Sequence, residues 1–181
     1  MLGGDLYNAL DPKLTSERTR SRLLISRFNN SPEDQPEERA IILKDLIPHA
    51  GNDFFVQPPF YCDYGSNIYC GEKVYFNFNC VVLDVMRVTI GDRCMFGPQV
   101  QIYTATHPLH WKDRSSGLES AKSVIIGHDV WVGGNTVICP GVKIGDRSII
   151  GAGSVITKDL PSDVMAAGNP CQVIRTLDPG E

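Results

Sequence analysis

The chain has 181 residues, of which 42% are hydrophobic and 21% are charged, and its formal net charge at pH 7 is −4. This length and composition predict one domain with a substantial core and exclude a disordered tail protein. The small acidic excess provides no electrostatic footprint for nucleic acid or for an anionic membrane surface, so neither is expected as a partner.

Hydropathy and cysteine spacing predict a cytoplasmic protein without a metal requirement. No apolar run reaches the roughly 18 residues that a membrane span needs, and the opening MLGGDLYNALDPKL lacks the apolar stretch of a secretory signal. The six cysteines are scattered without a CxxC pair. This spacing predicts neither a zinc ribbon nor a disulfide scaffold.

Residues 1–55 have a helical pattern. Asp11, followed by proline, is a typical helix start, and the next residues alternate leucines with arginines as an amphipathic helix does. A second helix is expected to open near Pro36, with Asp34 as its cap, and to end at Pro48. The two helices therefore form an N-terminal cap ahead of the rest of the chain.

A six-residue repeat spans most of residues 66–160, within the expected β-helical part of the chain at residues 56–181, which also includes a C-terminal tail. It places β-branched aliphatics at Ile126, Val132, Ile138, Ile144, Ile150 and Ile156, and four of the six following residues are glycines. The same phase recurs at Ile90, Phe96 and Ile102, and a shifted set runs through Ile68, Val74 and Cys80. Three such units close one triangular turn, and stacked turns bury the aliphatics. The repeat predicts an all-β solenoid, a parallel β-helix, and leaves its hand open.

One segment interrupts the repeat. Residues 108–123 contain proline, serines, glycine and charges without an aliphatic register, so they are expected to form a loop that projects from the β-helix. His107 ends the repeat unit before this loop, so we expect the β-helix to hold it and the loop to roof it. Histidine side chains titrate near neutral pH, which suits proton removal from a hydroxyl. A surface histidine in a turn is the alternative.

Several motifs then identify a family. They are residues 4–7 (GDLY), 62–68 (CDYGSNI), 77–79 (NFN), 103–108 (YTATHP), 130–134 (VWVGG), 140–145 (PGVKIG), 155–159 (VITKD) and 167–170 (AGNP). With these motifs the chain resembles the maltose and galactoside O-acetyltransferases and their nodulation relatives, which are hexapeptide-repeat acyltransferases. The resemblance covers nearly the whole chain.

The resemblance implies an architecture and an activity. It implies a left-handed β-helix and a homotrimer whose active sites lie between neighbouring subunits. It also implies transfer of acetyl from acetyl-CoA, as co-substrate, to a hydroxyl of a sugar of the maltose or glucose type by direct attack. A galactoside acceptor fits less well, because Val85 stands where the galactoside enzymes carry an acidic residue.

The same resemblance implies roles for individual residues. His107 matches the catalytic base, and the backbone N–H of Gly134 matches the donor that stabilises the charge developing on the carbonyl oxygen. The acceptor-binding set is Asn77, Asp63, Asp84 and Tyr75. The cofactor-binding set is Gly134, Ala152, Thr157, Lys158, Arg175 and Trp131. On residue type alone, Asn77 also fits a turn, and Lys158 and Arg175 also fit solvated surface charges.

Two other functions fit the same repeat. Zinc carbonic anhydrases use this solenoid and bind metal through three histidines, which His107, His110 and His128 could supply. A non-catalytic trimeric scaffold would only present its surface and would bind no coenzyme A. The acetyltransferase motifs favour the transferase over both.

Overall fold

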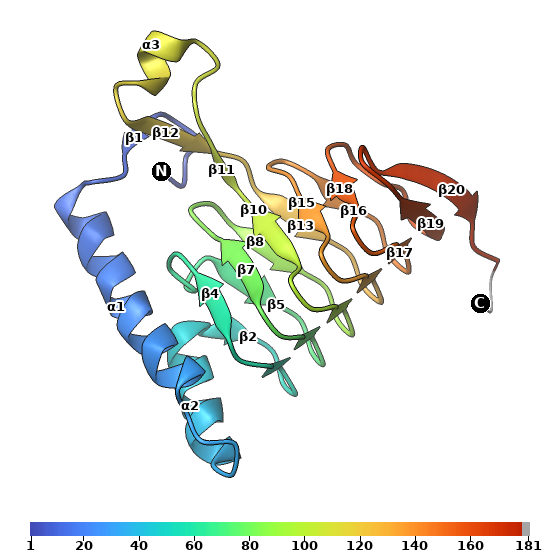
Figure 1. Cartoon of the computed structure of the whole chain (residues 1–181), viewed down its shortest axis with the longest axis horizontal. Helices are drawn as coiled ribbons and strands as arrows, with labels where there is room; N and C mark the ends of the chain where they lie inside the picture. The colour runs from blue at the N-terminus through green and yellow to red at the C-terminus, as the bar shows by residue number, and fades with distance from the viewer. Residues whose placement is uncertain (179–181) are drawn as a thin grey trace.

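The structure is a computed structural model that describes residues 1–178, and it opens with two packed helices (Figure 1). Helix α1 spans Pro12–Asn29, and the Asp11 carboxylate caps it by accepting the N–H groups of Lys13 and Leu14. Helix α2 spans Pro36–Leu46. The expected cap of α2 was wrong: Gln35, not Asp34, holds the N-cap position, and no side chain caps this helix.

The rest of the chain winds into a parallel β-helix with three faces. The first face contains β2 (His49–Ala50), β5 (Ile68–Cys70), β8 (Val88–Ile90), β13 (Val124–Ile126) and β16 (Lys143–Ile144). The second contains β3 (Phe55–Val56), β6 (Tyr75–Phe76), β9 (Met95–Phe96), β14 (Trp131–Val132), β17 (Ile149–Ile150), β19 (Val164–Ala167) and β20 (Gln172–Thr176). The third contains β4 (Phe60–Cys62), β7 (Cys80–Leu83), β10 (Gln101–Tyr103), β15 (Val137–Ile138) and β18 (Val155–Ile156).

The repeat positions form the core, as the sequence predicted. The side chains of Ile126, Val132, Ile138, Ile144, Ile150 and Ile156 have exposed fractions of 2% or less. The earlier positions Ile68, Val74, Cys80, Ile90, Phe96 and Ile102 are equally buried. Strands of successive turns pair in register, for example Ile102 with Ile138. The aliphatic of each unit therefore stacks on its equivalent in the next turn.

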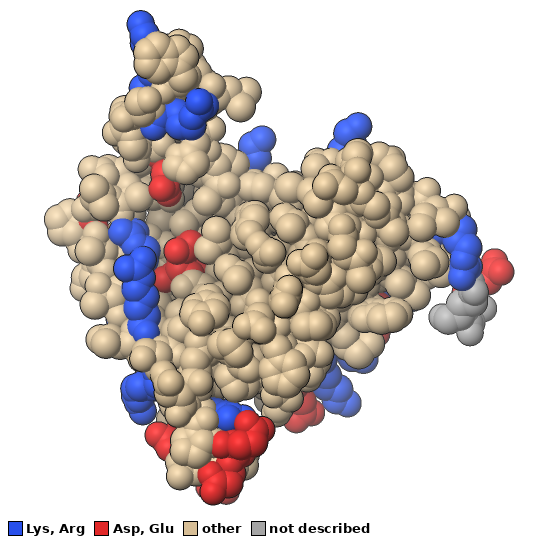
Figure 2. Space-filling view, viewed as in Figure 1, with Lys and Arg blue, Asp and Glu red and all other residues tan. Residues whose placement is uncertain are grey.

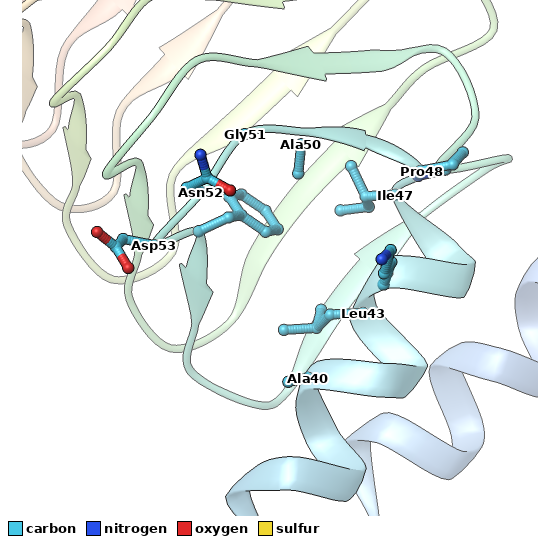
Figure 3. Close-up of a pocket in the computed structure, with 10 residues that line it drawn as sticks. Ala40, Leu43, Ile47, Pro48, Ala50, Gly51, Asn52 and Asp53 are labelled. Atoms are coloured by element: carbon cyan, nitrogen blue, oxygen red, sulfur yellow. The ribbon is translucent and has the colours of Figure 1, made fainter.

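Both ends of the β-helix are covered. Helix α2 packs Ile42 and Leu46 onto the core at the start, and a hollow of about 250 Å³ remains between it and the first turn (Figure 3). At the other end β20 pairs antiparallel with β19. The β-helix begins at β2, because His49 already pairs with Tyr69 of the next turn. The expected boundary at residue 56 is therefore too late.

The segment after β10 projects from the β-helix as expected (Figure 1). It contains β11 (Ala105–Thr106), the short helix α3 (Trp111–Arg114) and β12 (Leu118–Ala121). Strand β12 pairs antiparallel with β11 and also with β1 (Tyr7–Asn8) from the N-terminus. The projecting loop is therefore part of a small three-stranded sheet that the N-terminal segment completes.

Glycines at the corner between the first and second faces permit successive turns to stack closely. A Cβ atom on Gly91 would lie 2.6 Å from the carbonyl carbon of Gly127 in the next turn. We expect Gly91→Ala to lower the free energy of unfolding by about 1–3 kcal/mol, because backbone must move to admit the methyl group. Gly3→Ala is the control, since its Cβ would meet only the Asp5 side chain at 3.3 Å. Equal melting temperatures for the two variants would contradict this expectation.

No helix within residues 1–178 is both long and apolar enough to cross a membrane.

Candidate active site

The projecting loop leaves the corner between the third and first faces, and hydrogen bonds fix its root. Thr104 Oγ1 donates to the Leu83 carbonyl at 2.6 Å and accepts the Met86 N–H at 2.9 Å. The Lys122 N–H donates to the Thr104 carbonyl at 2.9 Å where the loop returns. The loop therefore departs from and returns to a fixed point on the β-helix.

His107 follows β11 on this loop. Its side chain is exposed and makes no hydrogen bond within residues 1–178. Because this side chain is exposed, the described part of the chain does not form the expected roof over His107. The ring is therefore open to a ligand or to a second copy of the chain.

The N-terminal strand β1 pairs with β12, which in turn pairs with β11, the strand just before His107. Tyr7 Oη donates to Glu119 Oε2 on β12 at 2.8 Å, and Thr106 and Ser120 join their hydroxyls at 2.7 Å between β11 and β12. Burial and the Glu119 hydrogen bond both raise the pKa of Tyr7, which keeps the phenol protonated. The position of His107 therefore depends on a segment about a hundred residues away in sequence.

Asp63 and Asp84 lie at the same corner, in the first two turns. Asp84 is fully buried, and its carboxylate accepts the N–H groups of Asp63, Tyr64 and Asn67 at 2.9–3.2 Å. Asp63 is half-buried beside α1. Burial raises the pKa of Asp63, and the nearby guanidinium of Arg18 opposes that rise.

The structure corrects the expected role of Asp84. The side chain of Asp84 is buried, and both of its carboxylate oxygens accept backbone N–H groups. Within one chain, Asp84 is therefore not accessible to the sugar that would accept the acetyl group. It instead holds the turn that carries Asp63. Burial raises the pKa of Asp84 to about 6 although the Tyr64 and Asn67 N–H groups lower it.

The raised pKa of Asp84 predicts a pH-dependent stability. A carboxyl group whose folded pKa, about 6, exceeds its ordinary value of 3.8 costs stability as it ionises, so the wild type loses stability between those values as pH rises. Asp84→Asn removes this titration. Relative to the wild type, the variant should gain up to about 3 kcal/mol between pH 4 and pH 7. Urea unfolding across this range measures the difference, and a difference independent of pH would contradict the assignment.

A second group of expected site residues lies at the corner between the second and third faces. Asn77, Gly134 and Ala152 occupy this corner in the second, fourth and fifth turns. The backbone N–H groups of Gly134 and Ala152 donate to no acceptor within residues 1–178. An unpaired N–H at an accessible corner is the arrangement that stabilises a developing oxyanion. Asn77 Oδ1 accepts the N–H of Phe78 at 2.7 Å.

The remaining expected residues are spread over other surfaces. Tyr75 and Trp131 lie on one outward row of the second face, in register with Met95 between them. Thr157 and Lys158 are exposed just after β18, at the corner that carries the loop. Arg175 lies on β20. One chain therefore does not gather the expected cofactor-binding residues into a single cleft.

The two corners lie on opposite edges of the third face (Figure 1). Strand β7, which crosses that face, has four residues and is therefore about 13 Å long. His107 and Asp63 lie at one edge, and Asn77 and Gly134 lie at the other. The base and the oxyanion donor expected from the sequence cannot act on one carbonyl group within one chain.

The histidines are also separated. His107 and His110 lie on the loop, whereas His128 lies at the corner between the first and second faces, where its Nδ1 accepts the Asp92 N–H at 3.0 Å. Within the described residues no three metal-ligating side chains come together. The three histidines therefore do not form the set that a zinc site within one chain would need.

Charged residues near Asp63 were missed at the sequence level. Arg18 on α1 donates to Tyr64 Oη at 2.8 Å and to the Ala9 carbonyl at 2.5 Å, and it also acts electrostatically on Asp63. Figure 2 shows basic side chains along α1 beside acidic side chains at the end of the third face. In the sequence, arginines on an amphipathic helix indicate only its solvent-exposed side, so the contact between Arg18 and Asp63 is needed to identify this cluster.

The solenoid, its projecting loop and the N-terminal helices define a hexapeptide-repeat transferase. Residues 1–51 match the maltose acetyltransferase hexapeptide capping motif, and residues 123–158 match the bacterial transferase hexapeptide. Galactoside O-acetyltransferase of Escherichia coli K12 is 41% identical over 97% of this chain and 86% of its own. The crystal structure of a maltose O-acetyltransferase from Clostridium difficile 630 is 46% identical, with a TM-score of 0.97 over 98% of this chain and 95% of its own.

A solved galactoside acetyltransferase in complex with coenzyme A is similarly close. It is 41% identical, with a TM-score of 0.95 over 97% of this chain and 88% of its own. The chain therefore belongs to the maltose and galactoside O-acetyltransferase family, as its motifs predicted, and it is an acetyltransferase with the left-handed parallel β-helix of that family.

Proposed function

We propose that this chain transfers acetyl from acetyl-CoA to a hydroxyl of a sugar, at sites formed between subunits of a homotrimer. The separation of His107 from Gly134 and Asn77 across the third face is the observation that carries the proposal. A base at one corner and an oxyanion donor at another can serve one reaction only if a neighbouring copy brings its own corner alongside. Closed rings of identical heterologous contacts satisfy this requirement.

The outer surfaces of the β-helix support such an assembly. The outward row of the second face is formed by Phe55, Tyr75, Met95, Trp131, Ile149 and Met165, and that of the third face beyond its first turn by Val81, Gln101, Val137 and Val155. Nearly all of these side chains are apolar, and a monomer would leave them in water. Apolar patches of this extent are typical of interaction surfaces.

The proposed reaction uses His107 from one corner and Gly134 from the other. His107 removes the proton of the acceptor hydroxyl as its oxygen attacks the carbonyl carbon of the thioester. The carbonyl oxygen becomes negative, and the N–H of Gly134 from the neighbouring subunit donates to it. When the C–S bond breaks, the coenzyme A thiolate leaves and takes the proton from His107. The ester and free coenzyme A are the products.

The remaining residues bind the two substrates in this proposal. Asn77 and Tyr75 contact the acceptor from one subunit, and Asp63 contacts it from the other. Ala152, Thr157, Lys158, Arg175 and Trp131 follow the acetyl-CoA path, and Arg175 meets a phosphate group. The coenzyme A complex of the galactoside acetyltransferase supports the choice of co-substrate.

A thiol-release assay tests the proposed function. Purified protein is mixed with acetyl-CoA and a panel of neutral sugars, and free coenzyme A is measured with a thiol reagent while the sugar product is identified by mass. We expect release that depends on both the sugar and the acetyl-CoA. Coenzyme A binding by calorimetry without transfer to any sugar would contradict the sugar acceptor, and no binding would contradict the transferase site.

Arg175→Ala should raise the KM for acetyl-CoA by about five- to tenfold with little change in kcat. The guanidinium is expected to meet a phosphate group far from the reacting carbonyl, so its loss weakens ground-state and transition-state binding equally. Initial rates at varied acetyl-CoA measure the effect. Arg147→Ala is the control, because Arg147 lies outside the expected acetyl-CoA set and pairs with Asp163 at 2.5 Å. An unchanged KM for Arg175→Ala would remove this residue from the acetyl-CoA path.

A further inference from the structure

A groove lies between α1 and β4, and of the residues that line it only Asp63 has a part in the reaction described above. Its volume is about 570 Å³, within the range of about 300–1,000 Å³ found for small-molecule sites. Arg22 and Ser26 of α1 and Asn30, which follows the helix, line one wall, and Pro59 lies on the other. Asp63 closes the end of the groove that is nearest the projecting loop.

The two walls are fixed to each other, so the groove is formed before any ligand binds. Asn29 of α1 uses its whole amide on β4: its Nδ2 donates to the Phe60 carbonyl at 3.0 Å and its Oδ1 accepts the Phe60 N–H at 2.8 Å. Ile25 and Phe28 are buried between the helix and the β-helix core. A preformed site loses little conformational entropy on binding.

The chemistry of the lining suits a carbohydrate. Tyr61 is 49% exposed and presents an aromatic ring on which the apolar face of a sugar ring can stack. Arg22 and Ser26 lie four residues apart on one side of α1, and neither side chain makes a hydrogen bond within the described residues. A guanidinium and a hydroxyl with free hydrogen-bonding capacity match the hydroxyl groups of a neutral sugar.

The groove also leads to the site of reaction. Asp63 lies close enough to Glu119 of β12 for the two carboxylates to interact. Strand β12 pairs with β11, with Ser120 opposite Thr106, the residue before His107. A ligand that enters the Asp63 end of the groove therefore lies beneath the strand pair that holds the base.

We infer that this groove binds the further rings of a neutral oligosaccharide whose terminal ring receives the acetyl group near Asp63 and His107. The inference rests on the proposed sugar acetyltransferase function. Tyr61 is the platform for the second ring, and Arg22 and Ser26 bind hydroxyls of the rings beyond it. A monosaccharide would fill only the Asp63 end and would leave the rest of the groove empty.

Acceptor-length kinetics test the inference. The kcat/KM is measured for glucose and for its α-linked and β-linked oligomers with two, three and four rings. In one of the two series we expect kcat/KM to rise about tenfold from one ring to three, because the added rings stack on Tyr61 and form hydrogen bonds with the groove. Tyr61→Ala should remove this rise while changing kcat/KM for glucose by less than about twofold, and Tyr61→Phe should keep it. Arg22→Gln should reduce the rise, whereas Arg27→Gln, exposed on the same helix outside the groove, should not.

The outcomes separate the inference from the proposed function. Transfer to glucose and to both oligomer series with equal efficiency would overturn the groove assignment and leave the sugar acetyltransferase in place. A rise with length that survives Tyr61→Ala would likewise place the further rings elsewhere. Transfer to no sugar at all would overturn both.

Discussion

Replacing His107 with alanine is expected to lower kcat by at least about 100-fold, which is the usual loss when a general base is removed. The imidazole makes no hydrogen bond within residues 1–178, so its removal leaves no internal partner unsatisfied. The strands β11 and β12 are held by backbone pairing and by Thr106 and Ser120, so the loop should keep its shape. Steady-state rates with a saturating sugar measure the loss.

The loop offers a matched control for this experiment. His110 is also exposed and lies three residues further on, and its Nδ1 lies 3.3 Å from Asp113 Oδ2. His110→Ala should keep kcat within about twofold. Coenzyme A affinity, measured by calorimetry, should stay the same in both variants. Near-normal turnover of His107→Ala would refute its role as base.

Co-expression of two inactive variants is expected to restore activity. Asn77→Ala should lower kcat by about 100-fold by misplacing the acceptor, and His107→Ala should do so by removing the base. If each site takes His107 from one chain and Asn77 from its neighbour, random assembly leaves about a quarter of the sites with both residues intact. The mixed preparation should therefore reach about a quarter of wild-type activity.

The same experiment contains its own controls. Each variant, expressed alone with differently tagged copies of itself, should remain inactive. Mixing the two purified variants without co-expression should restore nothing unless subunits exchange. Co-purification of the two tags with no recovered activity would mean that one chain supplies both residues, and the site between subunits would be wrong.

The repeat allowed much of the fold to be predicted, because each aliphatic position occupies the same place in successive turns. Ile126 to Ile156 could be assigned to the core from spacing alone, and residues 108–123 to a projecting loop because they break that spacing. The local sequence pattern was less informative about where helices and strands begin and end. The first turn begins at His49 because the strand there pairs with Tyr69, a contact that no local pattern reveals.

The site could be predicted only in part, because its residues come from distant segments. The pairing of β1 with β12 joins the N-terminus to the loop, and the approach of Arg18 to Asp63 joins α1 to the first turn. A single sequence carries no signal for such contacts. For Asp84 the sequence did carry a signal. Cys80, Val82 and Asp84 are two residues apart, and side chains two apart in a strand lie on the same face, so the burial of Asp84 could have been predicted.

The covered ends of the β-helix have a consequence for how the protein avoids forming fibres. Every wall of a parallel β-helix is already paired, so the first and last turns alone offer unpaired backbone groups to another copy. Helix α2 lies across one of these turns, and β20, which runs antiparallel, ends the other. An identical chain therefore meets a helix at one end, and at the other end the second face stops at a strand that does not continue the parallel winding. Both features oppose growth by regular stacking of turns end to end.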